Sequence, residues 1–259
     1  MNVTVASAAI PVRGILGVRV ASLRHGAAIA HLSRALQDRT FTKVTFLNAH
    51  SANVACSDKE FAEALDDFLV LADGVGVDIA ARWLYGAPFP DNLNGTDFVP
   101  ALIKATRTPL TVALLGAKRV NVERAAKQLA KIAPQHRFVV INDGFFSAAD
   151  EPRVVADVGA LRPDILLVAM GVPRQEMWIE RNLGPEHCTM PIAVGALLDF
   201  LSGALPRAPE WMRRLRLEWL FRLLIEPSRL WRRYIIGNPL FLFRVLRQKL
   251  GGHGGEDRP

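Results

Sequence analysis

Cysteine is nearly absent from this chain of 259 residues, and long apolar runs are absent altogether. The two cysteines, Cys56 and Cys188, are too few for a disulfide framework or for a zinc site made of cysteines alone. No stretch of about 18 uncharged apolar residues exists that would predict a membrane-spanning helix. The N-terminal segment lacks the basic and apolar regions of a secretory signal. The sequence therefore predicts a cytoplasmic protein that is able to rest on a membrane surface.

The short motifs of several common enzyme classes are also missing. The chain has no Walker P-loop, no HExxH zinc motif and no GxSxG nucleophile elbow. Gly74 and Gly76 lack the third glycine of a dinucleotide fingerprint, which disfavours an NAD-dependent oxidoreductase. An Asp-x-Asp pair, with which many sugar-nucleotide enzymes hold a divalent metal, is absent too. No metal is therefore implied, and a diphosphate would be met by backbone N–H groups, helix N-termini or arginines.

Positive charge, by contrast, is abundant and concentrated in one segment. Lys and Arg number 32 against 25 Asp and Glu, a formal charge of +7. Residues 205–250 hold 11 of the basic and 3 of the acidic residues, so the rest of the chain is close to neutral. The same segment holds three of the five tryptophans, Trp211, Trp219 and Trp231. This composition is typical of helices that lie in a membrane interface, although a basic surface also suits phosphorylated ligands or nucleic acid.

Apolar runs that are typical of strands alternate with helical patterns over most of the chain. Strands are predicted at residues 44–48, 69–72, 110–115, 138–141, 165–170 and 192–194. Helices are predicted between them at 77–84 and 122–132, from residues 98 and 174, and over Phe61, Leu65, Phe68 and Leu69. Continuous apolar strands separated by helices are typical of parallel sheets covered on both faces. We therefore predict an α/β fold, a Rossmann-like and mostly parallel sheet with helices on both faces, in residues 1–204.

Residues 205–250 predict a basic helical appendage near the membrane, followed by a disordered tail at 251–259. Pro227 is predicted to end the first helix of this appendage, and the Gly237–Pro239 run is predicted to end the second. Apolar side chains that recur every four residues before Pro227 are predicted to share one helical face. They are Trp211, Leu215, Trp219 and Leu223.

Polar side chains follow several of the predicted strands, where open α/β sheets bind their ligands. Asp73 is either a base that takes a proton from a bound hydroxyl or the N-cap of the next helix. Asn48 and His50 are either hydrogen-bond partners for a sugar or an ordinary turn asparagine and a satisfied histidine.

Charged side chains in the second half of the chain leave similar alternatives open. Arg174 could meet a phosphate, and Glu176 could simply complement the dipole of its helix. Asp199 interrupts an apolar stretch as either a ligand contact or a cap. The appendage arginines could grip a diphosphate, form a solvated basic face or contact anionic lipid. A nucleic-acid module, which would lose affinity steeply with salt, is the competing interpretation of this basic segment.

Seven short motifs, each weak alone, occur together in one order. They are Phe46–His50 (FLNAH), Ala72–Val77 (ADGVGV), Asn94–Asp97 (NGTD), Gly171–Glu176 (GVPRQE), Arg207–Met212 (RAPEWM), Leu217–Arg222 (LEWLFR) and Glu226–Arg229 (EPSR). With this ordered set the chain resembles the WecG/TagA/CpsF family of bacterial glycosyltransferases (glycosyltransferase family 26), from about Gly14 to Leu250.

The resemblance implies transfer of a sugar from a UDP-sugar to a polyprenyl-diphosphate-linked saccharide, with inversion and without a metal or other cofactor. The expected partners are the UDP-sugar, the lipid-linked acceptor and an anionic membrane surface, and not nucleic acid. The expected location is the cytoplasmic face of the membrane, as a peripheral protein in cell-wall or exopolysaccharide synthesis. A homo-oligomer, the donor sugar and the pathway are left open.

The functional residues of the family carry over onto individual positions of this chain. The base falls on Asp73, acceptor or donor contacts on Asn48 and Gln175, a nucleotide contact on Asp199, and the appendage arginines on Arg222, Arg229 and Arg232. The family's appendage is thought to complete the active site when the enzyme meets the membrane. Phe46 is a departure, because some members carry a threonine there, and a hydroxyl contact to the sugar would be lost.

Overall fold

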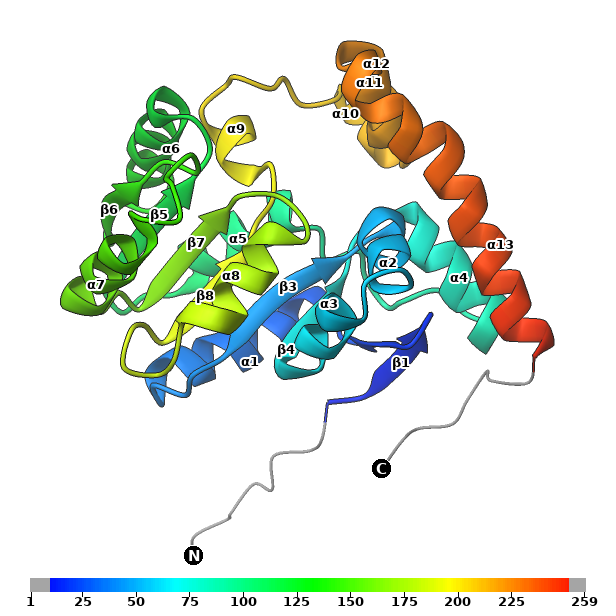
Figure 1. Cartoon of the computed structure of the whole chain (residues 1–259), viewed down its shortest axis with the longest axis horizontal. Coiled ribbons are helices and arrows are strands. Elements are labelled where there is room, and N and C mark those ends of the chain that lie inside the picture. Colours follow the sequence, from blue (N-terminus) through cyan, green and yellow to red (C-terminus); the bar gives the residue numbers. More distant parts are fainter. Residues whose placement is uncertain (1–9, 252–259) are drawn as a thin grey trace, which may run out of the picture.

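The computed structural model describes residues 10–251, in which eight strands form one sheet. The strand order is β1-β2-β4-β3-β8-β7-β5-β6, and every neighbouring pair is parallel except the β1–β2 hairpin at one edge (Figure 1). The strands are β1 (Val12–Ile15), β2 (Val18–Ala21), β3 (Lys43–Leu47), β4 (Phe68–Ala72), β5 (Thr111–Gly116), β6 (Arg137–Asn142), β7 (Ile165–Ala169) and β8 (Met190–Ala193). The predicted α/β fold is confirmed, and each of the six predicted strands is present to within two residues.

Helices cover both faces of this sheet, and each face has its own apolar core. One core is formed with α2 (Ala49–Ala55), α3 (Lys59–Ala64), α4 (Val75–Tyr85), α7 (Glu151–Leu161), α8 (Arg174–Asn182) and α13 (Gly237–Leu250). The other is formed with α1 (His25–Gln37), α5 (Gly95–Ala105), α6 (Arg119–Ile132) and α9 (Leu197–Leu201). Strand residues such as Leu166 and Leu167 alternate between the two cores, which explains why the strands are apolar throughout.

The predicted helix through Phe68 and Leu69 is wrong. Helix α3 ends at Ala64, a 3₁₀ turn η1 (Leu65–Asp67) follows, and β4 begins at Phe68. The sequence from Phe68 to Ala72 is apolar on both faces, and the sheet interior requires this of a strand with neighbours on both sides.

The C-terminal segment packs against the sheet domain rather than standing apart from it. It contains α10 (Glu210–Arg214), α11 (Glu218–Ile225), α12 (Pro227–Trp231), a π-helical turn η2 (Arg232–Ile236) and α13. Helix α13 lies against α2 and α4, and it inserts Phe241 and Val245, both fully buried, into the first core. Gln248 accepts a hydrogen bond from the N–H of Leu16 in the β1–β2 hairpin at 2.9 Å.

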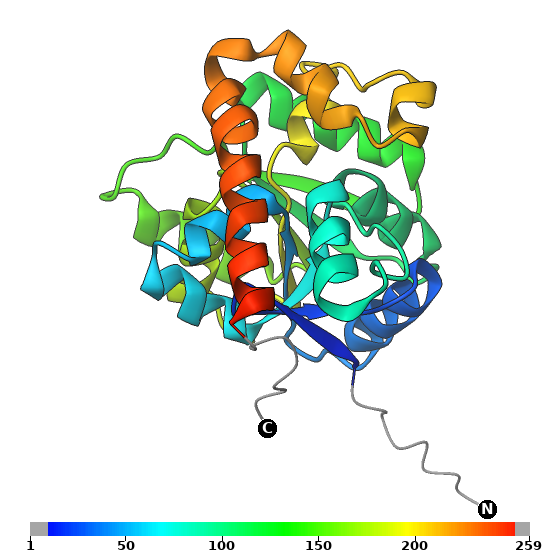
Figure 2. The ribbon, with the colours of Figure 1, turned by 90° about the vertical axis from the view of Figure 1, so that its right-hand side faces the viewer.

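The predicted break at Pro227 is confirmed, whereas the break at Gly237–Pro239 is wrong. Figure 2 shows α12, η2 and α13 as one long helix, drawn orange to red, along one side of the molecule. In η2 the N–H of Gly237 bonds to the carbonyl of Arg232, five residues back. This wider turn lies just before Pro239, where a missing N–H and a bulky ring would otherwise interrupt an α-helix.

The single apolar face predicted for residues 211–223 is also wrong. Arg216 has a left-handed backbone, with φ of 59°, and it separates α10 from α11. Trp211 and Leu215 are exposed, while Trp219 packs edge-on against the Tyr234 ring at 5.9 Å. None of the helices within residues 10–251 is long and apolar enough to cross a membrane. The predicted disordered tail falls, from residue 252 onward, outside the described residues.

Candidate active site

A cavity of about 620 Å³ lies where the carboxyl ends of the sheet strands meet the C-terminal helices. The sheet side of the cavity is formed by the loops and helix starts that follow β3, β4, β5, β6, β7 and β8, and by α9. The opposite side is formed by α11, α12 and η2, which lie over this end of the sheet in Figure 1. Among the lining residues are Asn48, Asp73, Gln175, Asp199, Arg222 and Arg229, six of the seven predicted site residues.

Asp73 is the first residue after β4, and its backbone N–H bonds to the carbonyl of Leu47 on β3. The alternative prediction of an N-cap does not hold, because Gly74, with φ of 90°, occupies the N-cap of α4 and no side chain caps this helix. Burial raises the pKa of the Asp73 carboxyl above its usual range, although a hydrogen bond from Asn48 and the charges of Arg233 and Arg222 oppose that rise. A buried carboxylate with a raised pKa is suited to accept a proton near neutral pH.

Asn48 combines the two roles that the sequence left open. It caps α2 by accepting hydrogen bonds from the N–H groups of His50 and Ser51, at 3.0 and 3.1 Å, and it also lines the cavity beside Asp73. The Ser51 hydroxyl accepts from the N–H of Asn48, which completes a capping box. Burial, and then the charge of Arg233, lower the pKa of His50 to about 4, so this lining side chain is neutral at pH 7.

Gln175 lies under the cavity with almost no exposure, and its polar atoms are engaged within the protein. Its Oε1 accepts hydrogen bonds from the N–H groups of Gly171 and Gly195, at 3.2 and 3.0 Å. Its Nε2 donates to Glu176 at 2.8 Å, and Glu176 also accepts from the Thr45 hydroxyl at 2.9 Å. Gln175 therefore ties together the loops after β7 and β8, both of which line the cavity.

Glu176 is fully buried behind this arrangement, rather than exposed beside the helix dipole. Burial, opposed by hydrogen bonds from Gln175 and Thr45, raises the pKa of Glu176 to about 7. Its second oxygen, Oε2, is buried, and no group of residues 10–251 donates a hydrogen bond to it. This burial was not predictable from the sequence, because a glutamate in the first turn of a helix is usually exposed.

Asp199 and Asn121 form a hydrogen-bonded pair in the cavity lining. Asn121 on α6 donates to Asp199 on α9 at 2.8 Å, and both residues line the cavity. Asp199 does not cap α9, because Ala196 holds that position without a side-chain bond. Of the two alternatives for Asp199, its place in the cavity agrees with a ligand contact.

Phe46, which stands where some family members have a threonine, lines the cavity. Asn94 caps the nearby helix α5, which begins at Gly95 rather than at the predicted residue 98. A Cβ atom at Gly95 would lie 3.0 Å from the Phe46 ring. The ring therefore occupies the space over Gly95 and gives this part of the cavity an apolar wall.

The appendage arginines divide into those that line the cavity and one that does not. Arg222, whose guanidinium lies over the Phe200 ring, and Arg229, paired with Glu226 at 2.8 Å, both line it. Arg232 is exposed and lies over the ring of its neighbour Trp231. Arg233, which the sequence interpretation missed, lines the cavity instead. The signal was its spacing, because residues four apart, such as 229 and 233, share a helix face more closely than residues three apart.

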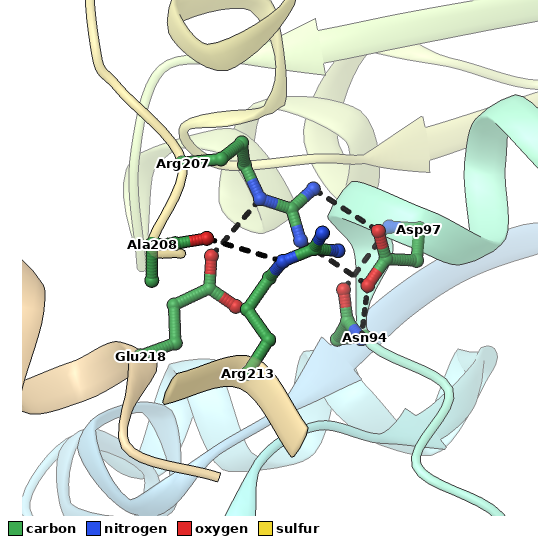
Figure 3. Close-up of polar contacts among 6 residues, drawn as sticks. All are labelled: Asn94, Asp97, Arg207, Ala208, Arg213 and Glu218. Atoms are coloured by element: carbon green, nitrogen blue, oxygen red, sulfur yellow. Dashed lines mark hydrogen bonds and ion pairs between the residues drawn. The ribbon is translucent and has the colours of Figure 1, made fainter. Parts of the chain in front are cut away.

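Ion pairs join the appendage to the sheet domain near the cavity. Arg207 donates to both carboxylate oxygens of Asp97 on α5, at 3.0 and 3.2 Å, and its Nε donates to Glu218 on α11 (Figure 3). Burial would raise the pKa of Asp97, but hydrogen bonds and charge from Arg207 hold it below its usual range. Arg216 pairs with the buried Asp78 on α4. These contacts fix the appendage in the position where its arginines line the cavity.

The cavity lining as a whole favours an anion. Five cationic side chains line it, against three carboxylates: Lys118, Arg174, Arg222, Arg229 and Arg233 against Asp73, Asp199 and Glu226. Arg222 and Arg233 each have a buried Nε without a hydrogen-bond partner in the described part of the chain. Within residues 10–251, no three His, Cys, Asp or Glu side chains are grouped as a metal site would require. Guanidinium groups with free donors are suited to bind phosphate oxygens.

Comparison with known proteins gives one family and a consistent group of relatives. Residues 13–254 match the model of the glycosyl transferase WecG/TagA/CpsF family. A Bacillus subtilis protein named N-acetylglucosaminyldiphosphoundecaprenol N-acetyl-beta-D-mannosaminyltransferase is 29% identical over 80% of this chain and 79% of its own. Proteins of the same name from Bacillus spizizenii and Staphylococcus aureus are 31% and 30% identical, over 70% and 78% of this chain and 68% and 78% of their own.

Proposed function

The chain belongs to the WecG/TagA/CpsF family of glycosyltransferases, and from this premise we propose that it transfers a sugar from a UDP-sugar to a saccharide carried on a polyprenyl diphosphate. The transfer inverts the anomeric centre and uses no metal. The protein acts as a peripheral protein at the inner face of the cytoplasmic membrane, in the synthesis of a cell-surface polysaccharide. The names of the relatives, which describe transfer onto a lipid diphosphate sugar, support the acceptor class.

One observation carries this proposal: a half-buried carboxylate and arginine donors without a hydrogen-bond partner in residues 10–251 line the same cavity. Asp73 lies on the sheet side, and Arg222 and Arg233 lie on the appendage side. A sugar transfer needs both groups, a base for the acceptor hydroxyl and a counter-charge for the leaving diphosphate. The arginines supply that counter-charge without a metal ion.

The reaction is a single displacement. The acceptor hydroxyl gives its proton to the Asp73 carboxylate while its oxygen bonds to the anomeric carbon from the face opposite UDP. The bond between that carbon and the UDP oxygen breaks, and its electron pair leaves with UDP. Arg222 and its neighbours meet the negative charge that develops on the diphosphate.

The outer surface of the C-terminal segment supports a place at the membrane. Of the fourteen large apolar side chains that are exposed in residues 10–251, eleven lie between 211 and 250. On α13 and the turn before it, an exposed stripe is formed by Ile236, Leu240, Phe243, Leu246 and Leu250. Arg232 and Arg247 are exposed among these apolar residues, as anionic headgroups would require. The stripe faces away from Phe241 and Val245, which pack into the core.

The test is a UDP-release assay over a panel of UDP-sugars, with a short-chain lipid diphosphate N-acetylglucosamine as acceptor and with or without a chelator. Asp73→Asn should lower turnover by about 10²–10⁴-fold, the usual contribution of a general base. The matched control is Asp66→Asn, which removes an exposed carboxylate from η1 and should retain turnover. Full activity of Asp73→Asn, or no UDP release with any donor, would contradict the proposal.

A further inference from the structure

Two neighbouring arginines of the long C-terminal helix lie in opposite environments. Arg232 is exposed, with its guanidinium 5.3 Å from the Trp231 ring centre. Arg233 is half-buried and lines the cavity. The difference follows from the helix, in which consecutive residues are turned by about 100° from each other. The two side chains carry the same charge on adjacent residues, and only one of them reaches the cavity.

Arg233 reaches Asp73 through Asn48. Its Nη2 donates to Asn48 Oδ1 at 3.4 Å, and Asn48 lines the cavity together with Asp73, where hydrogen bonding by Asn48 lowers the pKa of the Asp73 carboxyl. The Nε of Arg233 is buried without a hydrogen-bond partner, and no carboxylate of residues 10–251 forms an ion pair with this side chain. Arg207, Arg216 and Arg229 are all ion-paired. The charge of Arg233 is therefore free to act on the carboxylate nearby.

Charged and titratable groups face Asp73 from three elements. His50 on α2 is neutral at pH 7, because burial and Arg233 lower its pKa to about 4. Helix α11 contributes Arg222, which favours the ionised carboxyl, and Glu218, which opposes it. The turn η2 contributes Arg233, whose charge holds the pKa of Asp73 down more than that of Arg222 does. Since burial pushes the pKa of Asp73 upward, the ionised state depends on these arginines.

We propose that Arg233 is a positioning residue, which orients Asn48 against Asp73 and keeps Asp73 ionised, so that the base is competent only while the appended helix is seated on the sheet domain. The inference rests on the proposed role of Asp73 as the base. The seating itself is built by Phe241 and Val245 in the core and by Arg244, which donates to the backbone and side-chain oxygens of Asn53 on α2 at 2.9 Å. The appendage thus supplies more than a diphosphate contact, because it also sets the charge of a residue on the opposite wall.

The direct test is a ¹³C NMR titration of the Asp73 carboxyl carbon in the intact protein, with the signal assigned through Asp73→Asn. Arg233→Gln should move the midpoint of this titration upward by a pH unit or more, a tenfold gain in proton affinity, because a lowering charge has been removed. Arg232→Gln, which removes the same charge one residue away, should leave the midpoint in place. Arg233→Lys, which retains the charge, should give a midpoint between those of the wild type and Arg233→Gln.

An unchanged midpoint in Arg233→Gln, or an equal shift in Arg232→Gln, would overturn the inference. Circular dichroism shows whether each variant folds, and Arg233→Lys carries the test if Arg233→Gln does not fold. The kinetic counterpart is the acidic limb of kcat/KM against pH, which should move upward in Arg233→Gln, so that activity recovers in part at high pH.

If Asp73→Asn is inactive while Arg233→Gln retains the wild-type limb, the inference fails and the proposed function stands. If Asp73→Asn is fully active, the proposed function fails, and the NMR midpoint still decides whether Arg233 controls Asp73.

Discussion

The two walls of the cavity are built in different ways. On the sheet side, polar side chains are held by hydrogen bonds within the protein, as Gln175 is by Gly171 and Gly195, and as Asp199 is by Asn121. On the appendage side, Arg222 and Arg233 have buried donors without partners. Gln175 and Asp199 on the sheet wall thus have partners within the protein, whereas the appendage wall has donors that an anion would satisfy. Loss of the hydrogen bonds that hold the sheet wall together should cost stability, whereas loss of Asp73 from that wall or of an arginine from the appendage wall should cost function.

The largest effect is expected from Gln175→Leu, which breaks the sheet wall. This change removes the acceptor that the N–H groups of Gly171 and Gly195 share, and it removes a donor from the buried Glu176. Each of these three hydrogen bonds contributes about 1 kcal/mol, so the free energy of unfolding should fall by about 3 kcal/mol. Urea denaturation measures the loss, and turnover should fall with it because both loops line the cavity. Gln128→Leu, at an exposed position on α6, is the control and should stay within about 0.5 kcal/mol of the wild type.

Glu176→Gln tests the sheet wall through the pH dependence of the protein's stability. Glu176 has a pKa of about 7 in the folded protein, above the usual 4.5, so the folded state holds its proton more tightly than the unfolded state does. The stability that this proton contributes is complete below about pH 4.5 and is lost as the pH rises through 7. Glutamine cannot ionise, so Glu176→Gln should gain stability relative to the wild type between pH 5 and pH 8, by up to about 3 kcal/mol.

Denaturation of both proteins at pH 5 and pH 8 measures this gain. Glu63→Gln, at an exposed site on α3, is the control and should show little change in relative stability over the same range. An equal difference in stability at both pH values would mean that Glu176 is ionised throughout, and that its burial does not hold a proton.

Arg222→Gln tests the opposite wall, and its expected effect lies in function alone. Among residues 10–251 the Nε of Arg222 has no hydrogen-bond partner, and its guanidinium lies over Phe200, so the folded state loses little when the charge is removed. A hydrogen bond to a charged group contributes about 1.5–3 kcal/mol, so kcat/KM should fall by about 10–100-fold with no change in melting temperature. Arg229→Gln is the matched comparison and should lose less, because Glu226 already engages Arg229. A fall in stability equal to that of Gln175→Leu would remove the distinction between the walls.

The parts of this molecule that were predictable from sequence are those that repeat a local pattern. The strands and Asp73 could be located because apolar runs end in polar residues and glycines, and parallel strands bring those ends to one edge. The helix faces of the appendage could not be located in the same way. The left-handed Arg216 and the π turn before Pro239 each change the helical register, and neither has a sequence signal of its own. Arg232 was expected in the cavity from the family resemblance, whereas Arg233 lines it in the structure.

For the same reason, the sequence did not show which face of α13 is buried, and the burial of Phe241 and Val245 was not predicted. The C-terminal segment is basic and rich in apolar residues all along, so composition indicated a separate module. In the structure, one stripe of α13 packs into the core and another is exposed, which only the packing against α2 and α4 could decide. A deletion of the whole segment would therefore expose core surface, and point variants on the outer stripe are the sharper test of membrane binding.

The smallest effect is expected on that outer stripe, which belongs to neither wall. Leu240→Ser and Phe243→Ser each remove an exposed apolar side chain without altering the core or the cavity lining. At about 25 cal/mol per Å² of apolar surface withdrawn from water, each should weaken binding to anionic vesicles by about 1 kcal/mol, or about fivefold. Flotation or co-sedimentation with vesicles of anionic and zwitterionic lipid measures the change.

Val120→Ser, an equally exposed apolar site on α6, should bind as the wild type does. With a water-soluble acceptor, turnover of both stripe variants should be retained, because the stripe lies outside the cavity. Equal vesicle binding by all three variants would show that the exposed stripe does not contact lipid, and the membrane would then have to be met by another surface.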